Sequence, residues 1–233
     1  MTKKILIIII FFGFLAAGSL YAQEKQKKSW NTDKIKGTRF IVYPPYAGTP
    51  YLNEKFVIGD IELTDGTIIR DLGLRYSTFK DELIYYNNDI SAQIVIDKIS
   101  LKGFSFDDGN GIKRVFRSQY YDIYFHEQRF FEVLSDGKIS LLAYRKADLE
   151  TCETSYSKFG LAYQQSYRYY FYSAEKGYSP VNLTRNSLLS KFEKPDQKLI
   201  KKILRKNDAQ FVDESGFVKA WNVIKDSGIK INL

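Results

Sequence analysis

Few residues in this chain are of types that perform acid–base or nucleophilic chemistry. His126 is the single histidine and is followed by Glu127, and Cys152 is the single cysteine. A histidine beside a carboxylate could act as a general base, but no motif marks a nucleophile for it, and the further ligands of a zinc site are missing. We therefore interpret His126 as a turn or surface histidine and Cys152 as a structural or exposed thiol. The sequence favours a protein that is not an enzyme.

A calcium site is the second chemistry to consider, because Asp107–Gly111 (DDGNG) places carboxylates and carbonyls close together. The stretch lacks the Asp-x-Asp-x-Asn-Gly order of a calcium-binding loop and its distal glutamate, and a hairpin turn explains all five residues. Motifs for nucleotide phosphates, dinucleotides, a serine nucleophile or a catalytic zinc are also absent from the sequence. We predict no metal and no cofactor.

Aromatic residues are the first feature that indicates binding. The chain has 18 tyrosines and 17 phenylalanines, concentrated in Tyr120–Phe125, Phe130-Phe131 and Tyr167–Tyr172. Exposed tyrosines bind sugars, peptides and apolar ligands, although cross-strand packing in a sheet also explains such residues. The tyrosines of a candidate ligand surface are Tyr121, Tyr124, Tyr167, Tyr169, Tyr170 and Tyr172.

A basic segment near the C-terminus is the second such feature. Lys191–Lys206 contains seven basic residues and only two acidic ones, so the segment carries a charge of +5. It could rest on an anionic membrane surface or an acidic partner, and a solvated helix face explains it as well. We predict that nucleic acid is not the partner, because no binding motif is recognisable. The candidate contact residues are Lys198, Lys201, Lys202 and Arg205.

Alternating apolar and polar residues predict a mainly β fold that positions these side chains. Phe56–Tyr86 predicts a meander of three short strands, and Asp65-Gly66 suits a type I′ turn between two of them. Asp136-Gly137 predicts a second hairpin with the same turn, and Arg39–Tyr43 predicts an earlier strand. Short strands at this spacing indicate an antiparallel meander, either barrel-like or a sandwich.

After Thr184 the pattern changes to helical spacing. Thr184 or Asn186 caps a first short helix, Pro195 opens a second, and a third runs from about Glu214 to Asp226. Such short helices must pack their apolar stripes on the sheet or on one another. The predicted organisation is a signal peptide at 1–22, a flexible lead-in at 23–38, an antiparallel β domain at 39–183 and a helical segment at 184–233.

The N-terminus predicts export through the Sec pathway. Lys3 and Lys4 precede the apolar run Ile5–Phe14, and Ala22 is a suitable residue before a signal-peptidase cut. A retained membrane anchor is the alternative, and the absence of a nearby cysteine excludes a lipidated N-terminus. Cleavage would leave 33 basic and 27 acidic residues, a net charge of +6. A single cysteine in an exported chain favours a bacterial envelope, so we expect a periplasmic or secreted protein with no later transmembrane segment.

Two parts of the chain carry motifs of a known family. The motifs are Thr49–Phe56, Leu74-Arg75-Tyr76 and Asp81-Glu82 at the start, and Tyr169–Ser173, Leu188-Leu189 and Leu199–Ile203 at the end. With them the chain resembles an uncharacterised exported family that is common in Bacteroidota. The resemblance covers most of the chain after the signal, and it implies an exported protein with an antiparallel β domain and short C-terminal helices. The family has no known activity, so it implies no catalytic residue.

Two functions remain as hypotheses. The first is a non-catalytic binding or interaction protein of the bacterial envelope, which contacts an envelope protein, a glycan or a lipid through its aromatic strands and basic helices. The second is a carrier of a lipid-like or other apolar ligand, or a hydrolase, with a pocket inside a partly closed barrel. An exposed aromatic patch favours the first function, and an apolar interior cavity favours the second. We favour the first.

Overall fold

The computed structural model describes residues 32–109, 111–122, 127–152 and 159–232. The predicted signal peptide at 1–22, Tyr124 and His126 lie outside the described residues. The elements in chain order are η1 (Thr32–Lys34), β1 (Gly37–Arg39), β2 (Ala47–Gly48), β3 (Val57–Leu63), β4 (Ile68–Ser77), β5 (Glu82–Asn87), β6 (Ala92–Ile96), η2 (Lys98–Ser100), β7 (Leu101–Asp107), β8 (Lys113–Asp122), β9 (Glu127–Ser135), β10 (Ser140–Thr151), β11 (Leu161–Ser173), β12 (Gly177–Val181), α2 (Arg185–Leu189), α3 (Lys194–Lys206) and α4 (Glu214–Lys225).

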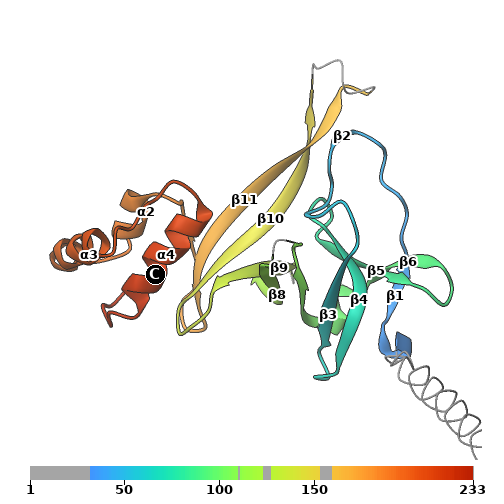
Figure 1. Ribbon diagram of the computed structural model, residues 1–233, viewed down its shortest axis with the longest axis horizontal. Coiled ribbons are helices and arrows are strands. Elements are labelled where there is room, and N and C mark those ends of the chain that lie inside the picture. Colours follow the sequence, from blue (N-terminus) through green and yellow to red (C-terminus); the bar gives the residue numbers. More distant parts are fainter. Residues whose placement is uncertain (1–31, 110, 123–126, 153–158, 233) are drawn as a thin grey trace, which may run out of the picture. The chain divides into compact units, whose positions relative to one another are not determined.

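The strands form one 12-stranded sheet that does not close on itself, followed by three short helices (Figure 1). Along the sheet the order is β1-β6-β5-β4-β3-β7-β8-β9-β10-β11-β12, and every pair on this path is antiparallel. Among the strands that the structure describes, only the short strand β2 pairs in parallel, with β11. The prediction of a mainly β, antiparallel meander with a C-terminal helical segment is confirmed.

The opening meander is present as β3, β4 and β5, but its first turn differs from the predicted type. Gly66 has φ +82°, whereas Asp65 is not in the left-handed region that a type I′ turn requires at both central positions. The Gly66 N–H instead donates to the carbonyl of Leu63 at 2.9 Å, which closes a turn one residue earlier. Gly66 therefore provides the left-handed residue that follows this turn, where a side chain would be strained.

The predicted strand at Arg39–Tyr43 is wrong in its position, because β1 ends at Arg39. The chain then leaves the sheet edge and crosses to β11, where Ala47 and Gly48 pair with Ala162 and Tyr163. Pro44 and Pro45 cannot donate hydrogen bonds to a neighbouring strand, which suits a crossing segment. This crossing links the two halves of the meander.

The three helices pack on the end of strands β10 and β11 that lies next to the β9–β10 loop and the β11–β12 turn (Figure 1). Phe217 and Trp221 of α4 are 0% and 2% exposed, and the Trp221 ring lies 4.5 Å from the ring of Phe171 in β11. Ile200 and Leu204 bring α3 into the same core, as the predicted apolar stripe requires. Within the described residues, no helix has both the length and the apolarity needed to cross a bilayer.

The first turn of α4 offers a test of this helix's local stability. Asp213 is the N-cap, and its carboxylate accepts a hydrogen bond from the Gly216 N–H at 2.7 Å. We expect Asp213→Ala to lower the free energy of unfolding by about 1 kcal/mol, because an N–H at the helix start loses its partner. The measurement is urea denaturation followed by tryptophan fluorescence. Asp226→Ala at the other end of α4 is the control, and an equal loss there would contradict the capping role.

Candidate functional site

Helix α3 presents a rigid basic face to solvent. Pro195 occupies the first turn, where its missing N–H costs nothing, and Ile200 and Leu204 are buried in the core on one side of the helix. With 3.6 residues per turn, the basic residues fall on the opposite side. The predicted contact residues Lys198, Lys201, Lys202 and Arg205 are all exposed on this face.

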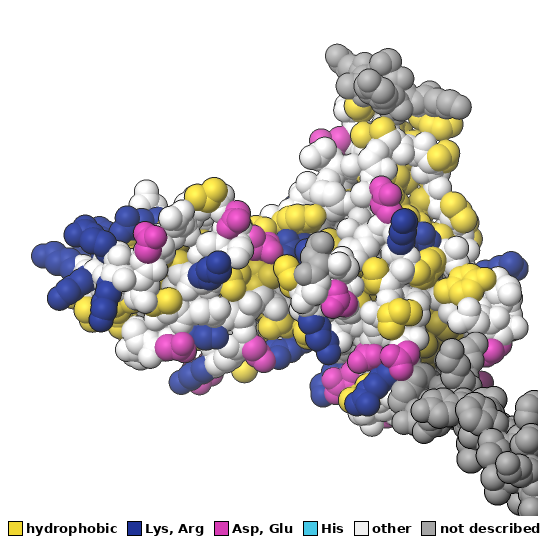
Figure 2. Space-filling view, viewed as in Figure 1, with side chains coloured by type: hydrophobic (Ala, Val, Ile, Leu, Met, Phe, Trp, Pro, Cys, Tyr) yellow, Lys and Arg dark blue, Asp and Glu magenta, His cyan; other side chains and the backbone are white. Residues whose placement is uncertain are grey.

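The basic face includes two residues of the predicted basic segment beyond the four candidate contact residues. Lys194 and Lys206 are also exposed, and the apolar side chain of Leu199 is 51% exposed beside them. In the space-filling view the basic side chains gather into one dark blue group over the helix (Figure 2). None of the six forms a salt bridge with a residue that the structure describes. We call these six residues, Lys194, Lys198, Lys201, Lys202, Arg205 and Lys206, the α3 basic face.

The candidate tyrosines, by contrast, mainly form packed clusters. Strands β8 to β12 curl so far that the Tyr178 hydroxyl of β12 donates to Gln119 Oε1 of β8 at 3.1 Å. Tyr121 lies inside this curl, 5.6 Å from the ring of Tyr170 and 5.3 Å from that of Tyr178. Tyr170 is 4% exposed and Tyr172 packs at the edge of the same cluster. Aromatic side chains therefore fill the concave side of these strands.

The remaining described tyrosines lie on the other face of β11. Tyr169 is partly buried and packs against the core beneath the helices. Tyr167 is 42% exposed, and the guanidinium of Arg145 lies 4.6 Å from its ring. Because Tyr124 lies outside the described residues, Tyr167 is the most exposed of the candidate tyrosines that the structure describes. Of the described candidate tyrosines, Tyr167 is therefore the exposed one, and Tyr120, beside the candidate Tyr121, is 52% exposed.

An ion-pair network at Arg145 was not predicted from the sequence. Arg145 is 2% exposed, and it donates from Nε to Glu132 Oε2 at 2.6 Å and from both Nη atoms to Glu214 of α4 at 2.7 and 2.8 Å. Burial alone would raise the pKa of Glu214, but the hydrogen bonds and positive charge of Arg145, together with a hydrogen bond from Tyr169, outweigh burial and hold that pKa below its usual value. The network joins the sheet to helix α4, and its residues lie too far apart in sequence to form a motif.

Asp107 and Cys152, which were first considered for chemistry, lie in a turn and at a strand end and make hydrogen bonds with the backbone. The carboxylate of Asp107 accepts hydrogen bonds from the backbone N–H groups of Gly109 and Gly111, as in a hairpin turn. Cys152 is half-buried at the end of the long β10–β11 hairpin, and its N–H donates to the carbonyl of Gly160 at 2.8 Å. His126 lies outside the described residues.

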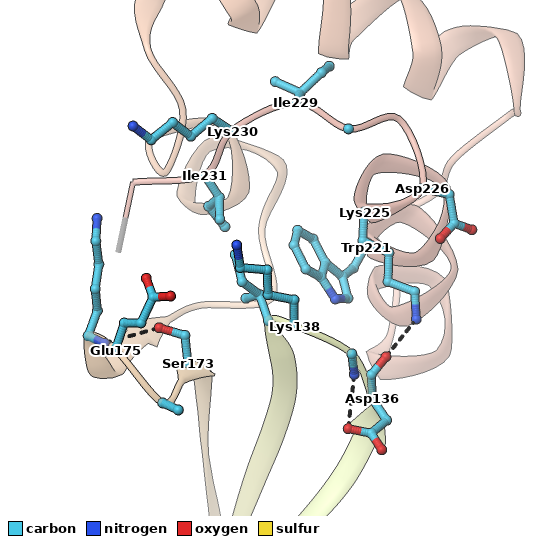
Figure 3. Close-up of a pocket in the computed structure, with 15 residues that line it drawn as sticks. Asp136, Lys138, Ser173, Glu175, Trp221, Lys225, Asp226, Ile229, Lys230 and Ile231 are labelled. Carbon is cyan, nitrogen blue, oxygen red and sulfur yellow. Dashed lines mark hydrogen bonds between the residues drawn. The ribbon is translucent and has the colours of Figure 1, made fainter.

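A cavity of about 750 Å³ lies where the tips of two hairpins meet α4 (Figure 3). The β9–β10 loop, the β11–β12 turn, the end of α4 and the segment after it form its walls. The sequence did not predict this cavity, because its walls come from segments that are distant in sequence. The charged residues that line it are Lys138, Lys176, Lys225, Lys230, Asp136, Glu175 and Asp226.

Two of these charged residues are already engaged by the protein. The guanidinium of Arg117 forms a two-pronged hydrogen bond with Asp136 and lowers the pKa of that carboxyl to about 2. Lys225 donates to Ser135 Oγ at 2.8 Å and to the carbonyl of Asp136 at 3.0 Å. These contacts fix the loop that forms one wall of the cavity.

Comparison of the chain with protein-family models, curated proteins and solved structures returned no match.

Proposed function

We propose that this protein is a non-catalytic interaction protein of the bacterial envelope, which binds an anionic membrane surface through the α3 basic face. The observation that carries the proposal is the arrangement of α3 itself. Six basic side chains stand on the exposed side of a helix whose opposite side is anchored in the core through Ile200 and Leu204. A fixed cationic surface of this kind loses little freedom when it meets a surface of opposite charge.

A lipid surface suits this helix better than a structured acidic protein does. Its cations are repeated along the helix and are mostly lysines, which act as point charges and need no matching geometry in the partner. Each lysine or arginine near an anionic leaflet contributes about 1 kcal/mol. The apolar side of α3 is occupied by the core, so the attraction is electrostatic and should weaken with salt.

The location that this function requires rests on the sequence. The N-terminal residues have the pattern of a Sec signal peptide, and we propose that the mature, non-lipidated chain is periplasmic or secreted. We also propose membership of the exported Bacteroidota family that the chain resembles. The alternative function, a carrier or hydrolase with a pocket inside a partly closed barrel, has less support, because Tyr121, Tyr170 and Tyr178 fill the concave side of β8–β12.

Vesicle sedimentation of the mature chain tests the proposal. We expect binding to vesicles of phosphatidylglycerol and phosphatidylcholine, and at least tenfold weaker binding to phosphatidylcholine alone. Replacing Lys198, Lys201, Lys202 and Arg205 together by glutamine should reduce binding at least tenfold, because most of the helix's positive charge is lost. Raising the salt concentration to about 1 M should also release the wild-type protein, since the screening length then falls to about 3 Å.

A matched variant shows whether position matters or only total charge. Lys36, Lys55, Arg70 and Lys113 are likewise three lysines and one arginine, all exposed and all outside α3. Their replacement by glutamine should leave vesicle binding within about twofold of wild type. Equal losses in the two variants, or no binding to anionic vesicles, would contradict the proposal. Selective capture of an acidic protein in the absence of vesicle binding would instead identify a protein partner.

A further inference from the structure

We propose that the cavity at the hairpin tips binds a small amphiphilic carboxylate, with an apolar body and a single negative charge. The inference is independent of membrane binding, because α3 contributes none of the described residues that line this cavity. Its argument starts from Trp221, which lines the cavity and is 2% exposed. The indole N–H of Trp221 has no acceptor among the described residues.

A buried donor without an acceptor is costly in a folded protein. Leaving such a group unpaired costs about 1–3 kcal/mol, and most buried polar atoms therefore have a partner. The indole stands beside Lys138 and Ile231 in the middle of the residues that line the cavity (Figure 3). An oxygen atom of a ligand at this position would supply the missing acceptor.

The side chains around the indole define the rest of the ligand. Ile231 and Lys138 point toward one another in Figure 3, and Ile139 and Ile229 add further apolar surface to the lining. Lys138 is exposed and forms no salt bridge with a described residue, so its ammonium group is available to a carboxylate. Apolar walls with a few polar groups are typical of small-molecule sites.

The acidic residues of the lining limit the charge of the ligand. Glu175 and Asp226 belong to the same lining as Lys138, Lys176 and Lys230, while Asp136 and Lys225 are engaged within the protein. Three ammonium groups and two carboxylates therefore remain available to a ligand. The carboxylates of Glu175 and Asp226 would repel a ligand with several negative charges. A monocarboxylate provides one negative charge for an ammonium group and oxygen acceptors for the indole donor.

Calorimetric titration with decanoate, below its micellar concentration, tests the inference on the mature protein. We expect saturable binding at one site, and at least tenfold weaker binding of decyl maltoside and of decyltrimethylammonium. Trp221→Phe should weaken decanoate binding at least fivefold, because the ring is kept while the N–H donor is lost. Lys138→Gln should weaken it by a similar factor, and Lys36→Gln, outside the cavity, should not.

A variant's titration is interpreted only if its thermal midpoint lies within a few degrees of that of the wild type. If Trp221→Phe unfolds, Lys138→Gln on the exposed loop provides the test. No saturable heat with decanoate, or equal affinity for the neutral detergent, would overturn the inference. Unchanged affinity in Lys138→Gln would overturn it as well. The variant that lacks four charges of the α3 basic face should bind decanoate normally, so failure of the membrane proposal and failure of this one are separable.

Discussion

Replacing Arg145 by methionine should lower the free energy of unfolding by about 3–5 kcal/mol. The guanidinium is nearly inaccessible and provides hydrogen bonds to Glu132 in the sheet and Glu214 at the start of α4. Methionine fills much of the same space, but the carboxylate of Glu132, in a residue only 5% exposed, then loses its closest positive partner. Arg114, at 3.2 Å from Glu132, compensates only in part because it also approaches Asp108.

Urea denaturation of the wild type and Arg145→Met measures this loss. Arg145→Met combined with Glu132→Gln should recover part of it, because the buried carboxylate no longer carries a charge. If the double variant is as unstable as the single one, lost packing and not an unpaired charge explains the effect. A loss below about 1 kcal/mol in Arg145→Met would contradict the role of the network.

The same network makes stability depend on pH in a defined direction. The pKa of Glu214 is lower in the folded protein than its usual value, because the hydrogen bonds and positive charge of Arg145, together with a hydrogen bond from Tyr169, outweigh the opposing effect of burial. The folded state therefore binds fewer protons at this group than the unfolded state does. Its contribution is fully present above the unfolded pKa and disappears as the pH falls through the folded pKa. Glu214→Gln should flatten this part of the pH profile.

Removing Asp81 should cost about 3 kcal/mol. Asp81 is 6% exposed and accepts hydrogen bonds from the Tyr76 hydroxyl at 2.6 Å, from Lys98 Nζ at 2.7 Å and from the Phe130 N–H at 3.3 Å. Asp81→Ala leaves the Tyr76 hydroxyl without its partner in a residue that is 1% exposed. Alanine also fits poorly at the φ of +56° that Asp81 adopts.

Two further variants divide this effect into its parts. Asp81→Asn keeps a residue that tolerates positive φ and can still accept one hydrogen bond, so we expect about half the loss. Tyr76→Phe removes the hydroxyl but leaves the backbone unchanged, and should cost about 1 kcal/mol. Denaturation midpoints of the three variants provide the comparison. Asp81→Ala and Asp81→Asn both lack the charge, so equal stability of the two would show that neither the remaining hydrogen bond nor the backbone conformation contributes.

The sequence predicted those parts of the fold that depend on neighbouring residues. The meander after Phe56 and the helix from Glu214 follow from alternation and helical spacing, and each is a local pattern. The prediction of a strand at Arg39–Tyr43 was wrong in its position. The local pattern is that of a strand, but after Arg39 the chain leaves the sheet edge and crosses to β11. The predicted turn type at Asp65-Gly66 was also wrong, since this dipeptide suits more than one type of turn.

The buried ion pairs and the hydrogen bonds of buried carboxylates could not be predicted, because their partners come together only in the folded chain. Arg145 and Glu214 are 69 residues apart, and Phe130 and Asp81 are 49 residues apart. The cavity was missed for the same reason, since it is formed by two turns and a helix end that are distant in sequence. The α3 basic face was predictable, because a single helix carries all of its residues.

An environment-sensitive fluorophore on α3 tests the membrane proposal most directly. The background is the mature protein with Cys152→Ser, and the label is attached at Leu199→Cys beside the basic face or at Lys113→Cys on β8. We predict a blue shift and increased emission at position 199 on addition of phosphatidylglycerol vesicles, reversed by about 1 M salt, and little change at position 113. No change at position 199, or the same change at both positions, would contradict binding through the α3 basic face.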